Sequence, residues 1–145
     1  MATMPVTVRP FLHPAHALLL AFPMALFPSA LANDIAYLNT AEMQWSNFAA
    51  WAITGALVFG GPVVLWALVD AVRYRGSPRG RRFGLYLLLL AVMWVAGLIN
   101  AFQHSRDAWS SVGTAGVLLS LVSSLCALAA GWIAHAGTVT KGNGR

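Results

Sequence analysis

The chain has 145 residues, of which 59% are hydrophobic and only 9% are charged, with a formal net charge of +5. Soluble domains carry about 25% charged residues, so the composition excludes an ordinary water-soluble protein and favours a lipid bilayer as the solvent. Five of the nine Lys and Arg residues lie in one stretch, RYRGSPRGRR. Because that stretch lies between apolar segments, it predicts a membrane loop and argues against nucleic acid as a partner.

Four apolar segments of roughly the 20 residues that a bilayer core requires follow in chain order. The first covers residues 15–38, and after the polar loop NTAEMQWSN the second covers residues 48–72. The stretch RYRGSPRGRR, which we call the arginine loop, precedes the third segment, residues 83–103. The fourth segment covers residues 111–136, after the turn HSRDAWSS. We predict an all-α membrane protein with one domain, residues 1–145. Its four transmembrane helices form an antiparallel up-down bundle, and residues 138–145 form a flexible tail.

The first apolar segment also resembles a secretory signal, because PSALA followed by ND has the small-residue form of a cleavage site. Pro23 and Pro28, the two histidines before the apolar run, and the apolar IAYL beyond Asp34 are unusual for a signal. We therefore expect an intact first helix. The topology of the other three segments is the same in either case.

Basic residues predict the orientation of the bundle. Arg9, the arginine loop, Lys141 and Arg145 must share one side, whereas the other side has Arg106 with Asp34, Glu42 and Asp107. The positive-inside rule then places both termini in the cytoplasm of a multi-pass protein of the bacterial inner membrane. Trp66, Tyr74 and Trp132 are expected at the inner interface.

Polar residues within the segments form two groups at different depths. Ionisable residues inside a membrane are costly and face the bundle interior, so each group is a candidate site. The inner polar cluster consists of His13, His16, Asp70 and His135. The outer polar cluster consists of Asp34, Asn100, His104, Arg106 and Asp107. Between them only Ser120, Ser123 and Ser124 are polar, and these hydroxyls can bond to their own helix.

Residues of both clusters can have purely structural roles instead of functional ones. His104 is expected to hydrogen-bond to Asp107 or Asp34, and Asp107 or Ser110 to cap the fourth helix. His16 and His135 begin and end antiparallel helices, so they could ligate one b-type haem, or act only as interfacial residues. His104 has no second histidine at its depth, which excludes a pair of haems that would carry electrons across the membrane. The single cysteine and the lack of an HExxH motif disfavour a zinc site. We expect no metal site and no catalytic residues, and we expect that no cofactor is bound.

Several motifs resemble the family of small four-span membrane proteins called domain of unknown function 2231 (DUF2231). They are HPAHALLLAFPMALF with its closing ND, LWALVD, LINAFQHSRDAW and GWIAH, and together they extend over residues 12–137. The family pattern falls on His13, Pro14, Phe22, Pro23, Asp34 and Asp70. Members often have a histidine at the start of the third helix, where this chain has FGLYLL. The resemblance implies an inner-membrane protein without assigned activity, and relatives fused to redox modules imply an anchor or electron-transfer role.

These observations lead to one preferred function and two alternatives. We expect a non-catalytic membrane subunit that anchors a periplasmic or redox partner, with the lipid bilayer as its surroundings and oligomers allowed. The first alternative is an electron-transfer protein that binds haem b or quinone through His16 and His135. The second is a small-solute transporter, which the shortage of polar groups at mid-depth disfavours.

Overall fold

Four helices dominate the computed structural model, which describes residues 7–9, 11–106, 112–136 and 138–140. They are α1 (Pro14–Thr40), α2 (Met43–Arg73), α3 (Gly80–His104) and α4 (Thr114–His135). The helices contain 27, 31, 25 and 22 residues, and each is long and apolar enough to cross a membrane. The prediction of an all-helical class with four membrane-spanning helices is confirmed.

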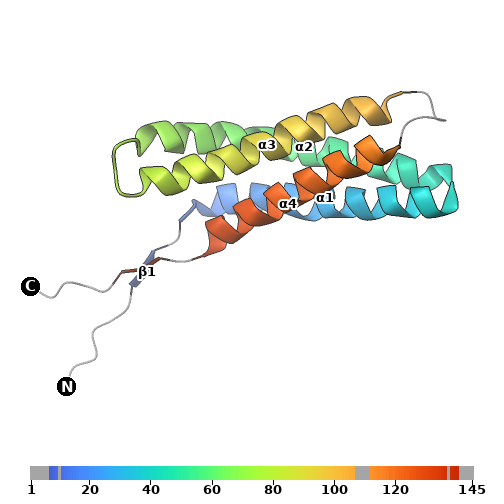
Figure 1. Cartoon of the computed structure of the whole chain (residues 1–145). Coiled ribbons are helices and arrows are strands. Elements are labelled where there is room, and N and C mark those ends of the chain that lie inside the picture. The colour runs from blue at the N-terminus through green and yellow to red at the C-terminus, as the bar shows by residue number, and fades with distance from the viewer. Residues whose placement is uncertain (1–6, 10, 107–111, 137, 141–145) are drawn as a thin grey trace, which may run out of the picture.

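The helices form a bundle in which α1 packs against α2 and α4, and α3 packs against the same two helices. Helices α1 and α3 therefore lie across one diagonal. Figure 1 shows that α1 meets α2, and α3 meets α4, at one end of the bundle, which we call the His104 end. The loop of residues 74–79 between α2 and α3 lies at the opposite end, together with the start of α1 and the end of α4. We call this the arginine end.

Buried positions recur at alternating intervals of three and four residues in α1 and α2, and α3 and α4 follow the same spacing with additional buried positions such as Ala96 and Ser124. This is the spacing by which helices of a left-handed bundle interlock. The outward positions carry large apolar side chains such as Leu18 and Leu65, which are 71% and 65% exposed in the isolated chain and suited to contact lipid. The interior combines large apolar side chains such as Leu20 and Phe27 with small and polar residues, which are common between membrane helices. In α1 the buried stripe is His16, Leu20, Pro23, Phe27, Ala30 and Asp34.

Local chemistry defines both ends of α1. The His13 side chain accepts a hydrogen bond from the Ala15 N–H at 3.2 Å, and Pro14 occupies the first turn, where its missing N–H costs nothing. At the other end, Ala41 adopts the left-handed conformation with φ 56°, and its N–H donates to the Tyr37 carbonyl at 2.8 Å. This arrangement ends α1 and turns the chain directly into α2.

The loop predicted over NTAEMQWSN is wrong, because α2 already begins at Met43 and only residues 41–42 separate the two helices. The apolar stretch marks only the lipid-embedded part of α2, and its first turn is polar but helical. The helix also continues through Pro62, as α1 does through Pro23 and Pro28.

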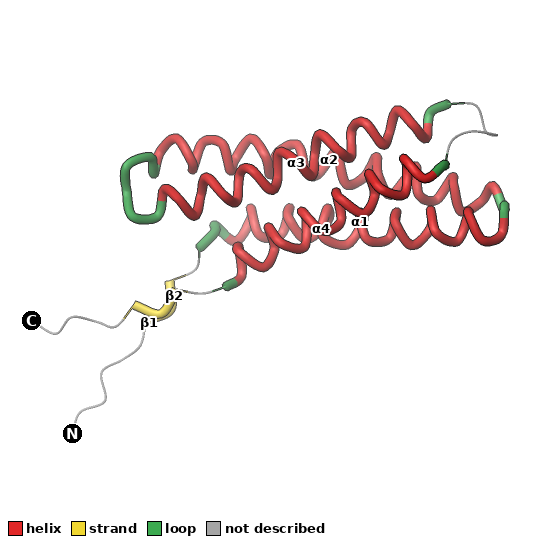
Figure 2. The backbone as a smooth tube through the Cα atoms, in the orientation of Figure 1, coloured by secondary structure: helices red, strands yellow, loops and turns green. Residues whose placement is uncertain are grey.

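The prediction of a flexible tail over residues 138–145 also needs correction. Strand β1 (Thr7–Arg9) pairs antiparallel with β2 (Thr138–Thr140), with Val8 opposite Val139. Figure 2 shows this pair beyond the arginine end of the bundle. The segments TVR and TVT are rich in β-branched residues, which favour strands, and the start of α1 and the end of α4 bring them together. Residues 141–145 lie outside the described residues.

Two glycines of α3 give a matched test of the packing. A Cβ atom at Gly97 would lie 2.6 Å from Cζ of Phe27, whose ring is fully buried, whereas a Cβ at Gly84 would have nothing within 4 Å. We expect Gly97→Ala to lower the free energy of unfolding by about 1–3 kcal/mol through overpacking. Gly84→Ala should leave it unchanged or slightly higher. Unfolding of both variants in detergent measures the difference, and equal stability of the two would contradict the close approach of Phe27 to Gly97 across the bundle.

Candidate functional site

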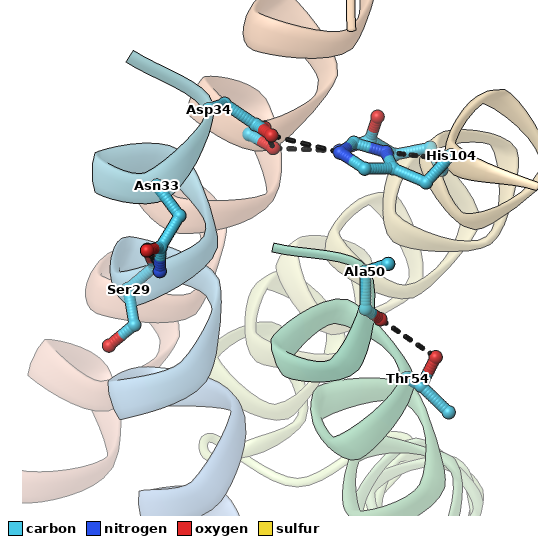
Figure 3. A network of polar contacts seen from close by, with 8 residues as sticks. Ser29, Asn33, Asp34, Ala50, Thr54 and His104 are labelled. Atoms are coloured by element: carbon cyan, nitrogen blue, oxygen red, sulfur yellow. Dashed lines mark hydrogen bonds and ion pairs between the residues drawn. The ribbon is translucent and has the colours of Figure 1, made fainter. Parts of the chain in front are cut away.

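A buried polar network joins three helices near the His104 end. His104 of α3 lies 2.9 Å from Asp34 of α1, between Nε2 and Oδ1, and the two face each other across the bundle in Figure 3. Ser120 of α4 donates to the other carboxylate oxygen of Asp34 at 2.5 Å, and the Asn100 amide donates to Ser120 at 2.7 Å. The side chains of Asp34 and His104 are 0% and 1% exposed. We call Asp34, Asn100, His104 and Ser120 the polar network.

The hydrogen-bonding pattern of the network requires one shared proton between Nε2 of His104 and the carboxyl group of Asp34. His104 Nδ1 lies 3.0 Å from the Asn100 carbonyl, which can only accept, so Nδ1 must carry a hydrogen. Nε2 then either donates to a carboxylate as an imidazolium or accepts from a neutral carboxyl group. Both forms give the pair zero net charge. The polar network therefore holds an acid and a base inside the bundle without an uncompensated charge, which would be costly there.

One buried oxygen atom of the network has no hydrogen-bond partner among the described residues. This atom is Asn100 Oδ1, although the amide nitrogen on the same side chain is bonded to Ser120. A Cβ atom at Gly116 of α4 would approach this oxygen to 3.6 Å, so the glycine allows α4 to pack closely over the network. The network is thus closed on the α4 side by backbone.

His104 also lines a pocket of about 450 Å³ at the same end of the bundle. The first turns of α2 contribute Gln44, Ser46 and Asn47 to its wall, and Arg106 contributes an exposed guanidinium. Among the described residues that line the pocket there is no Asp or Glu. The pocket therefore presents the amide groups of Gln44 and Asn47 and one positive charge to an occupant, next to the polar network. Asp107, which we placed in the outer polar cluster, lies outside the described residues.

The inner polar cluster contains a second buried contact between α1 and α3. His16 Nε2 lies 3.0 Å from the Tyr86 hydroxyl, and both side chains are fully buried. The ring of Trp66 on α2 lies 5.3 Å from the His16 ring, between centroids. His16 Nδ1 has no hydrogen-bond partner among the described residues.

The other three members of the inner polar cluster do not join this contact into one site. His13 is the exposed N-cap of α1 and stacks on Trp66, with ring centroids 5.6 Å apart. His135 is exposed, and its Nδ1 bonds to the Gly131 carbonyl of its own helix at 2.8 Å. Asp70 is half-buried. Within the described ranges, no group of three or more His, Cys, Asp or Glu side chains is arranged to hold a metal ion.

Three residues of these contacts were missed by sequence reasoning. We expected Ser120 to bond within its own helix, but its hydroxyl reaches Asp34 on another helix. Trp66 was assigned only to the inner interface and Tyr86 was given no role, although both contact His16. Helical spacing could have indicated two of them. Tyr86 lies on the same buried stripe of α3 as Asn100, and Ser120 lies on the same buried stripe of α4 as Ala127.

The fold and these contacts define a four-span membrane protein with a polar network inside one end of its bundle. The chain matches the family model described as "Predicted membrane protein (DUF2231)" over residues 12–140. It belongs to that family, as its motifs indicated. No curated protein and no solved structure matches the chain.

Two serines of α4 test the network against a matched control. Ser120→Ala removes a donor from buried Asp34 and an acceptor from Asn100, so we expect it to lower the free energy of unfolding by about 1–3 kcal/mol. Ser123 is also buried, but its hydroxyl has no partner among the described residues. Ser123→Ala should therefore be neutral or stabilising. Denaturant unfolding in bicelles measures both variants, and a Ser120→Ala protein as stable as Ser123→Ala would refute the network.

Proposed function

We propose that the protein is a membrane subunit of the bacterial inner membrane that anchors a partner protein on the periplasmic side. The observation that carries the proposal is the pocket at the His104 end, where Gln44, Asn47 and Arg106 surround an opening next to buried His104. Its volume of about 450 Å³ suits side chains of a docked loop better than a whole domain. The positive charge of Arg106 at the pocket favours an acidic side chain of the partner.

Rigidity of the pocket supports a docking role. The Asp34–His104 contact fixes α3 to α1 just below the pocket, and the two-residue turn after Thr40 holds the first turn of α2 close to α1. A preorganised site loses less entropy when a partner binds.

Orientation in the membrane supports a periplasmic partner. The arginine loop lies at the end opposite to the pocket, and the positive-inside rule places such a loop in the cytoplasm. The pocket would then face the periplasm, where the anchored domain of the partner, including a redox protein, would reside.

The geometry favours this role over haem-based electron transfer. Two axial histidines must direct a ring nitrogen at one iron atom. His16 Nε2 is already hydrogen-bonded to Tyr86, whereas His135 is exposed and directs Nδ1 at its own helix. No hydrogen bond or ring contact within the described ranges joins the two histidines.

Site-specific photocrosslinking tests the docking role. A photoreactive residue at Asn47, in the pocket wall, is expected to form one discrete adduct in native membranes. The matched control is the same residue at Val58, which is 63% exposed on the lipid-facing side of the same helix and should give no such adduct. Arg106→Glu should abolish the Asn47 adduct, because it reverses the charge that attracts the partner.

The crosslinked partner, identified by mass spectrometry, must have a domain on the periplasmic side. An impermeant maleimide applied to intact cells should label Ser105→Cys but not Ser77→Cys in the arginine loop, in a background with Cys126→Ala. Equal adducts from Asn47 and Val58, or an adduct that survives Arg106→Glu, would overturn the docking role. Labelling of Ser77→Cys alone would reverse the orientation.

A further inference from the structure

A second pocket, of about 620 Å³, lies at the arginine end, between the first turns of α3 and the last turns of α4. Two arginines, Arg81 and Arg82, line one part of it, and Leu85, Trp132 and Ile133 line the apolar part. Its lining, as far as the structure describes it, includes no Asp or Glu. The pocket is thus a positively charged recess with an apolar wall, at the level where a membrane helix leaves the lipid.

Arg82 is fixed in this recess by the end of α4. Its guanidinium donates to the carbonyl of Ile133 at 2.5 Å and to the carbonyl of Ala136, groups that the end of a helix leaves without intrahelical partners. The same guanidinium lies 4.3 Å above the ring of Phe11. Arg82 therefore ties α3 to α4 and shapes the pocket.

Arg81 has a different position. It is exposed, and the described residues provide it with no hydrogen bond and no salt bridge. Its charge is available to an anionic group that enters the pocket. Arginine is well suited to bind phosphate, since its planar guanidinium presents several donors in a fixed arrangement.

The apolar wall continues onto the lipid-facing surface. Trp132 is 79% exposed and Leu85 is 50% exposed, so both can contact the acyl chains of a lipid whose headgroup lies at Arg81. Tryptophan is enriched where membrane helices cross the headgroup region. Free phosphate would use the arginine alone, whereas a phospholipid would use both parts of the pocket.

We propose that this pocket is a binding site for one anionic phospholipid, whose phosphate contacts Arg81 and whose acyl chains lie along Leu85 and Trp132. Basic pockets between membrane helices commonly bind the headgroups of anionic lipids. The proposal is independent of the partner docked at the His104 end, because the two pockets lie at opposite ends of the bundle.

Native mass spectrometry of the detergent-purified chain tests the site, with phosphatidylglycerol, phosphatidylcholine and inorganic phosphate as the added probes. One phosphatidylglycerol should bind, and phosphatidylcholine should bind more weakly. Arg81→Gln should weaken phosphatidylglycerol binding about fivefold, the loss expected for one arginine near an anionic lipid. Arg75→Gln removes the same charge from an exposed loop position outside the pocket, so it should change binding less than twofold.

A second pair of variants tests the apolar wall. Trp132→Ala should weaken phosphatidylglycerol binding severalfold, whereas Trp51→Ala, at an equally exposed tryptophan near the other end, should not. Equal losses for Arg81→Gln and Arg75→Gln would overturn the proposal in favour of diffuse attraction. It would also be overturned if phosphatidylcholine bound as well as phosphatidylglycerol, or if inorganic phosphate displaced the bound lipid at matched concentration. Unchanged binding in Trp132→Ala would exclude the proposed place of the acyl chains.

Discussion

Two hydrogen bonds across one diagonal of the bundle hold α1 and α3 in a single register, and the rest of the structure depends on them. His16 bonds to Tyr86 at one end and Asp34 bonds to His104 at the other, and each pair is separated by 70 positions in the sequence. The equal separation requires α1 and α3 to run in the same direction without relative sliding over about 27 Å. Lipid provides little hydrophobic drive for helix association, so such contacts, with close packing of small residues, must specify the arrangement.

The two polar contacts enclose an apolar interior. Between His16 and Asp34 the buried stripe of α1 consists of Leu20, Pro23, Phe27 and Ala30. Apart from the buried hydroxyl groups of Ser123 and Ser124 on α4, the buried polar side chains of the described residues lie near the two ends of the bundle. The pocket next to His104 has amides and one arginine in its wall, and the pocket at Arg81 has an apolar wall. Under our two proposals, one end of the bundle binds a protein and the other binds a lipid.

The sequence predicted the membrane class and all four helices, because hydropathy over about 20 residues is a strong signal. It also placed Asp34, Asn100 and His104 at one depth, because each lies near the same end of its apolar segment, and it placed Asn100 and His104 on one helix face, since residues four apart share a face. The sequence could not show which polar groups meet across helices. Ser120 was assigned to its own helix because hydrophobic periodicity, which normally orients a helix, is lost when the outer face is as apolar as the core. The β1–β2 pair was missed because three-residue strands carry almost no periodic pattern.

A double-mutant cycle on Asp34 and His104 tests the central contact most directly. The free energy of unfolding in bicelles is measured for the parent chain, Asp34→Asn, His104→Gln and the double variant. If the two side chains are bonded as described, the losses of the single variants will not add, and the coupling energy will be at least about 1 kcal/mol. Losses that add within about 0.3–0.5 kcal/mol would show that the two residues do not interact, and would contradict the register of α1 and α3.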